Sequence, residues 1–134
     1  MMRMLKAVVL AISTYIVVGT VLVSLVHVLS PTDFDAQGNL LGGTASVFGL
    51  ATQGLSCFLA GAVAMACTRS VPPATMVVAG SVLFVFNLVL CAAFWSAAPA
   101  WYNWATLAMT FPFAALGVAW KGSALQHSQR AELR

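Results

Sequence analysis

Four long apolar stretches, with every charged residue outside them except Lys6 at the very start of the first, constrain this chain more than any other feature. The stretches cover about residues 5–30, 44–68, 73–96 and 101–120. A helix needs about 20 apolar residues to cross the hydrocarbon core of a bilayer, and each stretch is long enough. Only 7% of the residues are charged, against about 25% in soluble domains. We therefore expect an all-α fold, in which the whole chain forms one integral membrane bundle of four transmembrane helices.

The segments between the stretches are short and contain turn-forming residues. Residues 31–43 form the longest loop, which holds Asp, Asn and a Gly-Gly pair. Pro72 and Pro73 open the third stretch, and proline suits the first turn of a helix. Residues 121–134 form a polar tail. The short connections predict that the second, third and fourth helices are neighbours in the bundle.

The basic residues predict the orientation of the bundle. All Lys and Arg residues fall on one side of a four-span arrangement: Arg3, Lys6, Arg69, Lys121, Arg130 and Arg134. Positively charged loops stay in the cytoplasm. We therefore expect cytoplasmic N and C termini and an external 31–43 loop. The expected location is the cell membrane, as a multi-pass protein, with a bacterial inner membrane as the typical case.

The second stretch contains a row of unusually small residues. Gly49, Cys57 and Gly61 recur at helical spacing together with Ala45 and Gln53. Small residues let two helix backbones approach closely in a membrane. This helix is therefore expected to be the most enclosed of the four, with Gly49, Cys57 and Gly61 as packing residues.

Gln53 and Asn87 are amides within the apolar stretches, near the middle of the membrane. A polar group in hydrocarbon needs a hydrogen-bond partner, and two interpretations remain open. The amides could pair with each other and hold two helices together. Alternatively, they could contact a ligand in a small central cavity.

The first stretch carries Ser13, Thr20, Ser24 and His27, which fall on one face of a helix. This face could line a polar path toward the outer side. The hydroxyl groups could equally bond to their own helix backbone, and His27 could be a structural hydrogen-bonding group. We treat all four residues as candidates for ligand contact or for packing.

Three further residues suggest special roles. Pro112 lies inside the fourth stretch, where it removes a backbone hydrogen bond and is expected to bend the helix; it is a candidate hinge. Asp33 and Asp35 belong to a segment that partly matches a calcium-binding loop. The segment lacks the bidentate glutamate of such loops, so these residues are weak metal candidates.

Other classes of function are disfavoured. Apart from Lys6 at the start of the first, the stretches contain no Asp, Glu, Lys or Arg, whereas proton-coupled carriers usually need such a group at membrane depth. No zinc-site spacing and no Ser–His–acid set is evident. The basic residues are too scattered to bind nucleic acid. We expect no enzymatic activity and no cofactor.

The remaining prediction concerns function. The chain is expected to be a small non-enzymatic integral membrane protein that acts through helix–helix contacts. It would work as an accessory subunit or a homo-oligomer, with the lipid bilayer and other membrane-protein subunits, or itself, as partners. The alternative is a small carrier or pore for an uncharged or apolar solute.

Overall fold

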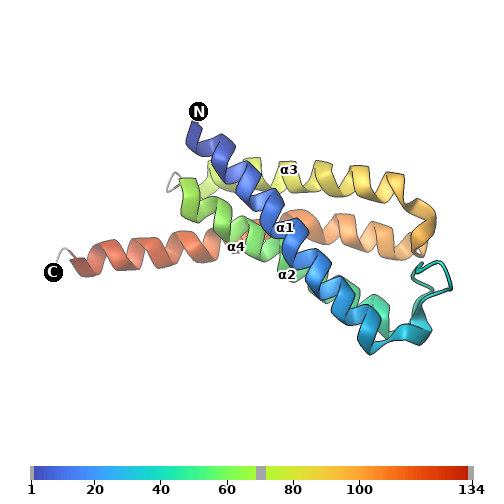
Figure 1. The fold of residues 1–134 in the computed structure, drawn as a ribbon. Coiled ribbons are helices and arrows are strands. Elements are labelled where there is room, and N and C mark those ends of the chain that lie inside the picture. Colours follow the sequence, from blue (N-terminus) through green and yellow to red (C-terminus); the bar gives the residue numbers. More distant parts are fainter. Residues whose placement is uncertain (1, 69–71, 133–134) are drawn as a thin grey trace.

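The computed structural model describes residues 2–68 and 72–132, and this part of the chain is all α-helical (Figure 1). The longer helices are α1 (Met2–Leu29), α2 (Gly43–Thr68), α3 (Pro72–Ala93) and α4 (Ala100–Glu132). Two short 3₁₀ helices, η1 (Pro31–Asp33) and η2 (Trp95–Ala97), lie in the connections. Arg69 and Arg134, which contribute to the predicted orientation, lie outside the described residues.

Three of the helices are long and apolar enough to cross a membrane, by length and composition. Within the described residues these are Arg3–Leu29, Gly43–Thr68 and Pro73–Ala93. The structure thus confirms that three of the four expected spans form helices long and apolar enough to cross a membrane.

α4 differs from the other helices. It is not among the three apolar helices, because its first half carries the polar residues Asn103, Thr106 and Thr110. It also runs without interruption to Glu132, beyond the predicted end of the fourth stretch at residue 120. Residues 121–132 are mostly good helix formers and contain no proline. Figure 1 shows this end of α4 extending past the other helices.

α2 is the most enclosed helix, as predicted. In its most apolar stretch 44% of the residues are buried, compared with 11% for α1 and 28% for α3. The row of small residues faces the interior, and Cys57 and Ala60 are completely buried. α1 lies against one side of α2, and α4 against another.

The closest approach in the bundle is between α2 and α4. A side-chain carbon added at Gly61 would collide with the backbone carbonyl of Ala114, and one added at Gly117 would collide with that of Phe58. Gly49 lies against the ring of Tyr102 in the same pair of helices. The absence of side chains at these glycines is therefore what lets the two backbones meet.

The loop between α1 and α2 is folded against the connection between α3 and α4. The backbone N–H of Leu40 donates to the carbonyl of Ala97 at 2.8 Å, and Leu40 forms an isolated bridge with Phe34. Asp33 accepts a 2.8 Å hydrogen bond from the N–H of Ala45. That N–H belongs to the first turn of α2, where it has no partner within the helix. Asp33 thereby ties the loop to the start of α2.

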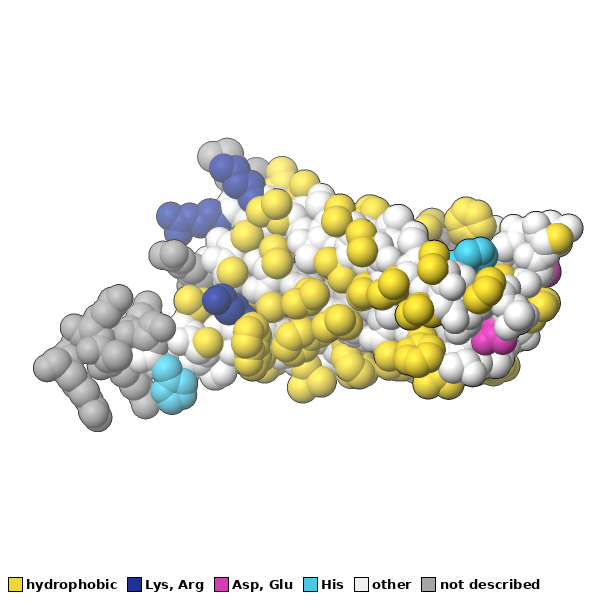
Figure 2. All heavy atoms as spheres, turned by 60° about the horizontal axis from the view of Figure 1, so that its bottom comes forward, with side chains coloured by type: hydrophobic (Ala, Val, Ile, Leu, Met, Phe, Trp, Pro, Cys, Tyr) yellow, Lys and Arg dark blue, Asp and Glu magenta, His cyan; other side chains and the backbone are white. Residues whose placement is uncertain are grey.

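Charged side chains gather at the two ends of the molecule. Figure 2 shows Lys and Arg side chains at the end that holds the chain termini, and acidic side chains at the opposite end. Hydrophobic side chains cover much of the surface between them. This distribution is the one expected of a helix bundle whose middle contacts lipid.

Candidate functional site

Three polar side chains from three different helices meet near the middle of the bundle. The Nε2 of Gln53 in α2 donates to the Oδ1 of Asn87 in α3 at 2.9 Å. The hydroxyl of Tyr15 in α1 lies 2.8 Å from Gln53 Oε1 and 2.7 Å from Asn87 Oδ1. The pairing of the two amides, one of the two interpretations drawn from the sequence, is therefore present, and Tyr15 completes it. We refer to Tyr15, Gln53 and Asn87 as the polar triad.

The triad is anchored at one end to the backbone. Asn87 Nδ2 donates to the carbonyl oxygen of Leu83 at 3.0 Å, one turn earlier in α3. Asn87 is almost fully buried, with 2% of its surface exposed, whereas Gln53 is only partly buried. A hydrogen bond between helices in a membrane contributes about 0.6 kcal/mol on average. The triad thus has a structural role in joining α1, α2 and α3.

One side of the triad faces a groove between α1 and α3. The space between these helices has a volume of about 10 Å³ near Ala7 and Ala79, where the helices are close. At the level of Tyr15 a separate and larger space of about 520 Å³ lies between them. Figure 1 shows the same divergence, with α1 running obliquely across the bundle.

Side chains from three helices line this α1–α3 groove. They are Tyr15, Ile16, Gly19, Thr20, Val23 and Ser24 of α1, Gln53 of α2, and Phe86 and Leu90 of α3. Several of the α1 residues are exposed at the surface of the bundle, so the groove opens toward the space that lipid would occupy. None of these described lining residues carries a charge. Pockets of about 300–1,000 Å³ are typical of small-molecule sites.

The polar face predicted for the first stretch is only partly gathered at this groove. Thr20 and Ser24 line it, whereas Ser13 and His27 are exposed elsewhere on α1. The imidazole of His27 lies against the ring of Phe34, with 4.4 Å between the ring centroids. His27 therefore contacts the loop rather than the polar triad.

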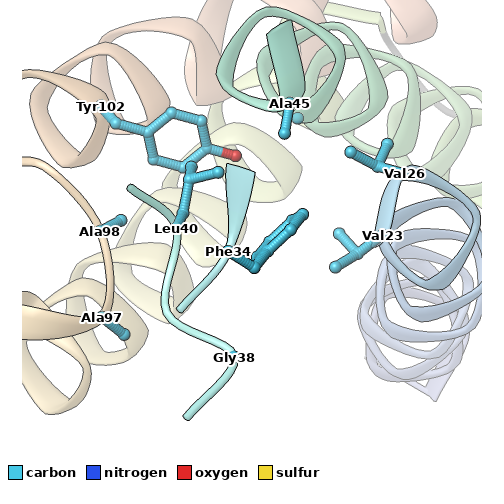
Figure 3. A pocket seen from close by; sticks show the side chains of 10 residues that line it. Val23, Val26, Phe34, Gly38, Leu40, Ala45, Ala97, Ala98 and Tyr102 are labelled. Atoms are coloured by element: carbon cyan, nitrogen blue, oxygen red, sulfur yellow. The ribbon is translucent and has the colours of Figure 1, made fainter. Parts of the chain in front are cut away.

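A second cavity of about 210 Å³ lies between the loop and the ends of α1, α2 and α4. Figure 3 shows Phe34 extending between the loop and α1, where Val23 and Val26 lie, with Tyr102 on the other side. Val23 also lines the α1–α3 groove. The two spaces are thus neighbours along α1. The groove lies near the middle of the bundle, and the second cavity, which we call the outer cavity, lies beneath the loop at the end of the bundle.

The other candidate residues take structural positions. Cys57 accepts a hydrogen bond from Gln53 Nε2 at 3.7 Å and is fully buried, while Gly49 and Gly61 face α4. α4 continues through Pro112, so the hinge remains a prediction.

The carboxylates of the two loop aspartates are bonded to protein N–H groups. Asp33 caps α2, as described above, and Asp35 accepts hydrogen bonds from the backbone N–H groups of Gln37 and Asn39. The side chain of Asn39 donates to Asp35 as well, at 2.8 Å. These bonds are those of a side chain that stabilises a turn.

Tyr15 is the residue that sequence reasoning missed. Tyrosine in a membrane protein is usually found at the water interface, but Tyr15 lies in the middle of α1 and is 7% exposed. A hydroxyl at that depth needs a partner. The position of Tyr15 in the middle of the stretch could therefore have indicated a buried, hydrogen-bonded hydroxyl. It could not have indicated which residues are its partners.

Comparison with known protein families, with curated proteins and with solved structures finds no match to this chain. The functional interpretation consequently depends on the geometry described above.

Proposed function

We propose that this chain is a non-enzymatic integral membrane protein that binds an uncharged, largely apolar solute in the α1–α3 groove and acts as a small carrier for it. The observation that supports this proposal is the groove of about 520 Å³ that has Tyr15 and Gln53 among its lining residues. Its walls are mainly aliphatic and aromatic, and its polar groups are uncharged. Such a surface matches a solute that partitions into lipid and carries one hydrogen-bonding group.

The outer cavity supports a carrier in particular. It lies next to the groove along α1, and the loop covers it. A solute that left the groove toward this end would pass Val23 and reach the space beneath Phe34 and Leu40. The groove and the outer cavity would then be two successive binding positions on one transport path.

The proposed orientation places α4 as a fourth span and both termini in the cytoplasm. α4 packs along α2 and α3, which favours a position within the bundle. Lys and Arg side chains gather at one end of the molecule and acidic side chains at the other (Figure 2), in agreement with the positive-inside rule. The loop and the outer cavity would then face the exterior.

The binding proposal can be tested by photocrosslinking in membranes. A long-chain hydrocarbon carrying a diazirine would be added to proteoliposomes, irradiated, and its attachment sites mapped by peptide mass spectrometry. We expect attachment to α1 and α3 residues of the groove, such as Ile16 and Leu90. Val23→Trp would fill the groove and abolish this attachment.

Val17→Trp is the matched control. Val17 is an exposed valine of the same helix that does not line the groove, so this variant should retain the crosslinks of the original protein. Uniform labelling of all exposed faces, unaffected by Val23→Trp, would contradict the proposal.

The exposed face of α1 supports a second candidate function, in which the chain acts through helix–helix contacts. Only 11% of the most apolar stretch of this helix is buried, so most of its apolar surface remains available to another helix. The chain would then be an accessory subunit or a homo-oligomer. Native mass spectrometry after extraction in mild detergent would show a complex in that case, and a single chain otherwise.

A further inference from the structure

The hydrogen bonds of the polar triad have only one possible direction. A backbone carbonyl can only accept, so the side-chain atom of Asn87 that lies 3.0 Å from the carbonyl oxygen of Leu83 must be its amide nitrogen. The oxygen of Asn87 therefore faces Gln53. Because that oxygen can only accept, Gln53 must present its own amide nitrogen, at 2.9 Å.

The same reasoning determines the role of Tyr15. With its nitrogen toward Asn87, Gln53 turns its Oε1 toward the tyrosine hydroxyl. The hydroxyl has a single proton, and the two triad atoms near it are both carbonyl oxygens, at 2.8 and 2.7 Å. The proton is consequently used within the triad, whichever of the two oxygens receives it.

The triad therefore offers hydrogen-bond acceptors to the groove and no hydrogen-bond donor. The hydroxyl oxygen of Tyr15 retains lone pairs, and the carbonyl oxygen Gln53 Oε1 has two, of which Tyr15 uses at most one. Gln53 Nε2 has no proton to offer, since its two protons point to Asn87 Oδ1 and to Cys57 Sγ. Of the triad, Tyr15 and Gln53 line the groove.

From this geometry we propose that the groove selects a long-chain alcohol from the surrounding bilayer. Such a lipid is uncharged, and its head group is a hydrogen-bond donor. The inference rests on the proposed solute-binding function and specifies its ligand class. The head hydroxyl donates to Tyr15 Oη or Gln53 Oε1, and the alkyl chain lies along the apolar walls formed by Ile16, Phe86 and Leu90. The hydroxyls of Thr20 and Ser24 also line the groove, farther along α1, so the selection applies to a head placed beside Tyr15 and Gln53. At that place a head that can only accept finds no triad donor and leaves those lone pairs unpaired.

The residues around the groove also disfavour a charged head group on the ligand. The described residues that line the groove carry no charge. The nearest charged residues along the chain are Lys6, near the start of α1, and Asp33 in η1, beyond the end of α1. An ion placed beside Tyr15 would lose its hydration without gaining a counter-ion. The ligand class is therefore limited to neutral molecules.

Three competitors of matched chain length test this selectivity. Hexadecanol, hexadecyl methyl ether and hexadecane would each compete with the diazirine hydrocarbon for crosslinking to the groove, at equal mole fractions in proteoliposomes. A hydrogen bond to a buried acceptor should make the alcohol effective at about a five- to tenfold lower mole fraction than the ether. The comparison is made in a Thr20→Val, Ser24→Ala background, which removes the other two hydroxyls of the groove, and there the ether should behave like the alkane.

A variant that lacks both acceptors provides the reference. Tyr15→Phe combined with Gln53→Leu should reduce the alcohol's advantage over the ether to less than about twofold, since neither lone pair remains. Tyr15→Phe alone, which keeps the Gln53 carbonyl, should retain part of the advantage. This single variant serves if the double variant does not fold.

The possible results separate the two proposals. Loss of the alcohol's advantage in the variants, with crosslinks still in the groove, supports the donor-head ligand. Equal competition by alcohol and ether in the protein with an intact triad but without the Thr20 and Ser24 hydroxyls overturns this inference and leaves solute binding intact. Absence of groove crosslinks from the start overturns solute binding itself.

Discussion

Replacing Gly61 with alanine should destabilise the bundle, although the same change stabilises most helices. The added carbon would meet the backbone of Ala114, with the carbonyl carbon at 2.9 Å and the Cα at 3.1 Å. Ordinary van der Waals contacts between carbon atoms are about 3.5–4.0 Å. Because these atoms belong to the α4 backbone, a side-chain rotation cannot relieve the overlap, and α4 has to move.

The net effect can be derived from two opposing contributions. Alanine stabilises a helix by about 0.8–1.0 kcal/mol relative to glycine. Overpacking in a well-packed interior costs about 1–3 kcal/mol, and the upper end applies because Gly117 meets the carbonyl of Phe58 at the same crossing. We therefore expect a net destabilisation of about 2 kcal/mol. Gly61→Leu, with a much larger side chain, should prevent the two helices from meeting.

Gly19→Ala is the control, because the nearest atom to its added carbon is Ser56 Oγ at 3.7 Å, an ordinary contact. This variant should be as stable as the original protein or more stable, by up to about 1 kcal/mol. Gly49→Ala should be intermediate, since the atoms it meets belong to the side chain of Tyr102. Unfolding in mixed micelles with increasing SDS, followed by circular dichroism, would measure these differences. If Gly61→Ala were as stable as Gly19→Ala, the close packing of α2 and α4 would be refuted.

Three further predictions concern the triad, the topology and the loop. Gln53→Leu and Asn87→Leu should be non-additive in a double-mutant cycle, with a coupling of about 0.5–1.5 kcal/mol in unfolding; full additivity would mean that the two amides do not interact. Cysteines at Gln37 and Ser123, with the natural cysteines replaced, should react with a membrane-impermeant thiol reagent from outside and from inside respectively; reaction from the same side would exclude the four-span topology. The pKa of the Asp35 carboxyl is lowered, mainly by a hydrogen bond from an asparagine side chain in the same loop. The contribution of Asp35 to loop stability should therefore be present above the ordinary aspartate pKa and be lost as pH falls through the lowered value; loop NMR signals should show this transition, and its persistence in Asp35→Asn would contradict the assignment.

The sequence alone was sufficient for the features that depend on local composition. Helices that could cross a membrane follow from runs of apolar residues, and three of them are confirmed. The enclosed position of α2 was predictable too, because glycine at positions such as 49 and 61 gives no advantage against lipid, whereas it permits close packing. The need of each amide for a partner in hydrocarbon made the contact between Gln53 and Asn87 one of two interpretations, the other being contact with a ligand.

The tertiary structure alone determined which residues meet and where space remains. Tyr15 bonds to residues 38 and 72 positions away in the chain, and the α1–α3 groove exists because α1 diverges from α3. The partners of Gly61, and the polar residues that α4 buries, also depend on how each helix is tilted and rotated. These tilts and rotations result from the packing of all the helices together. The periodicity of a single helix shows which face is small or polar, but it contains no information on the residue of another helix that will lie against that face.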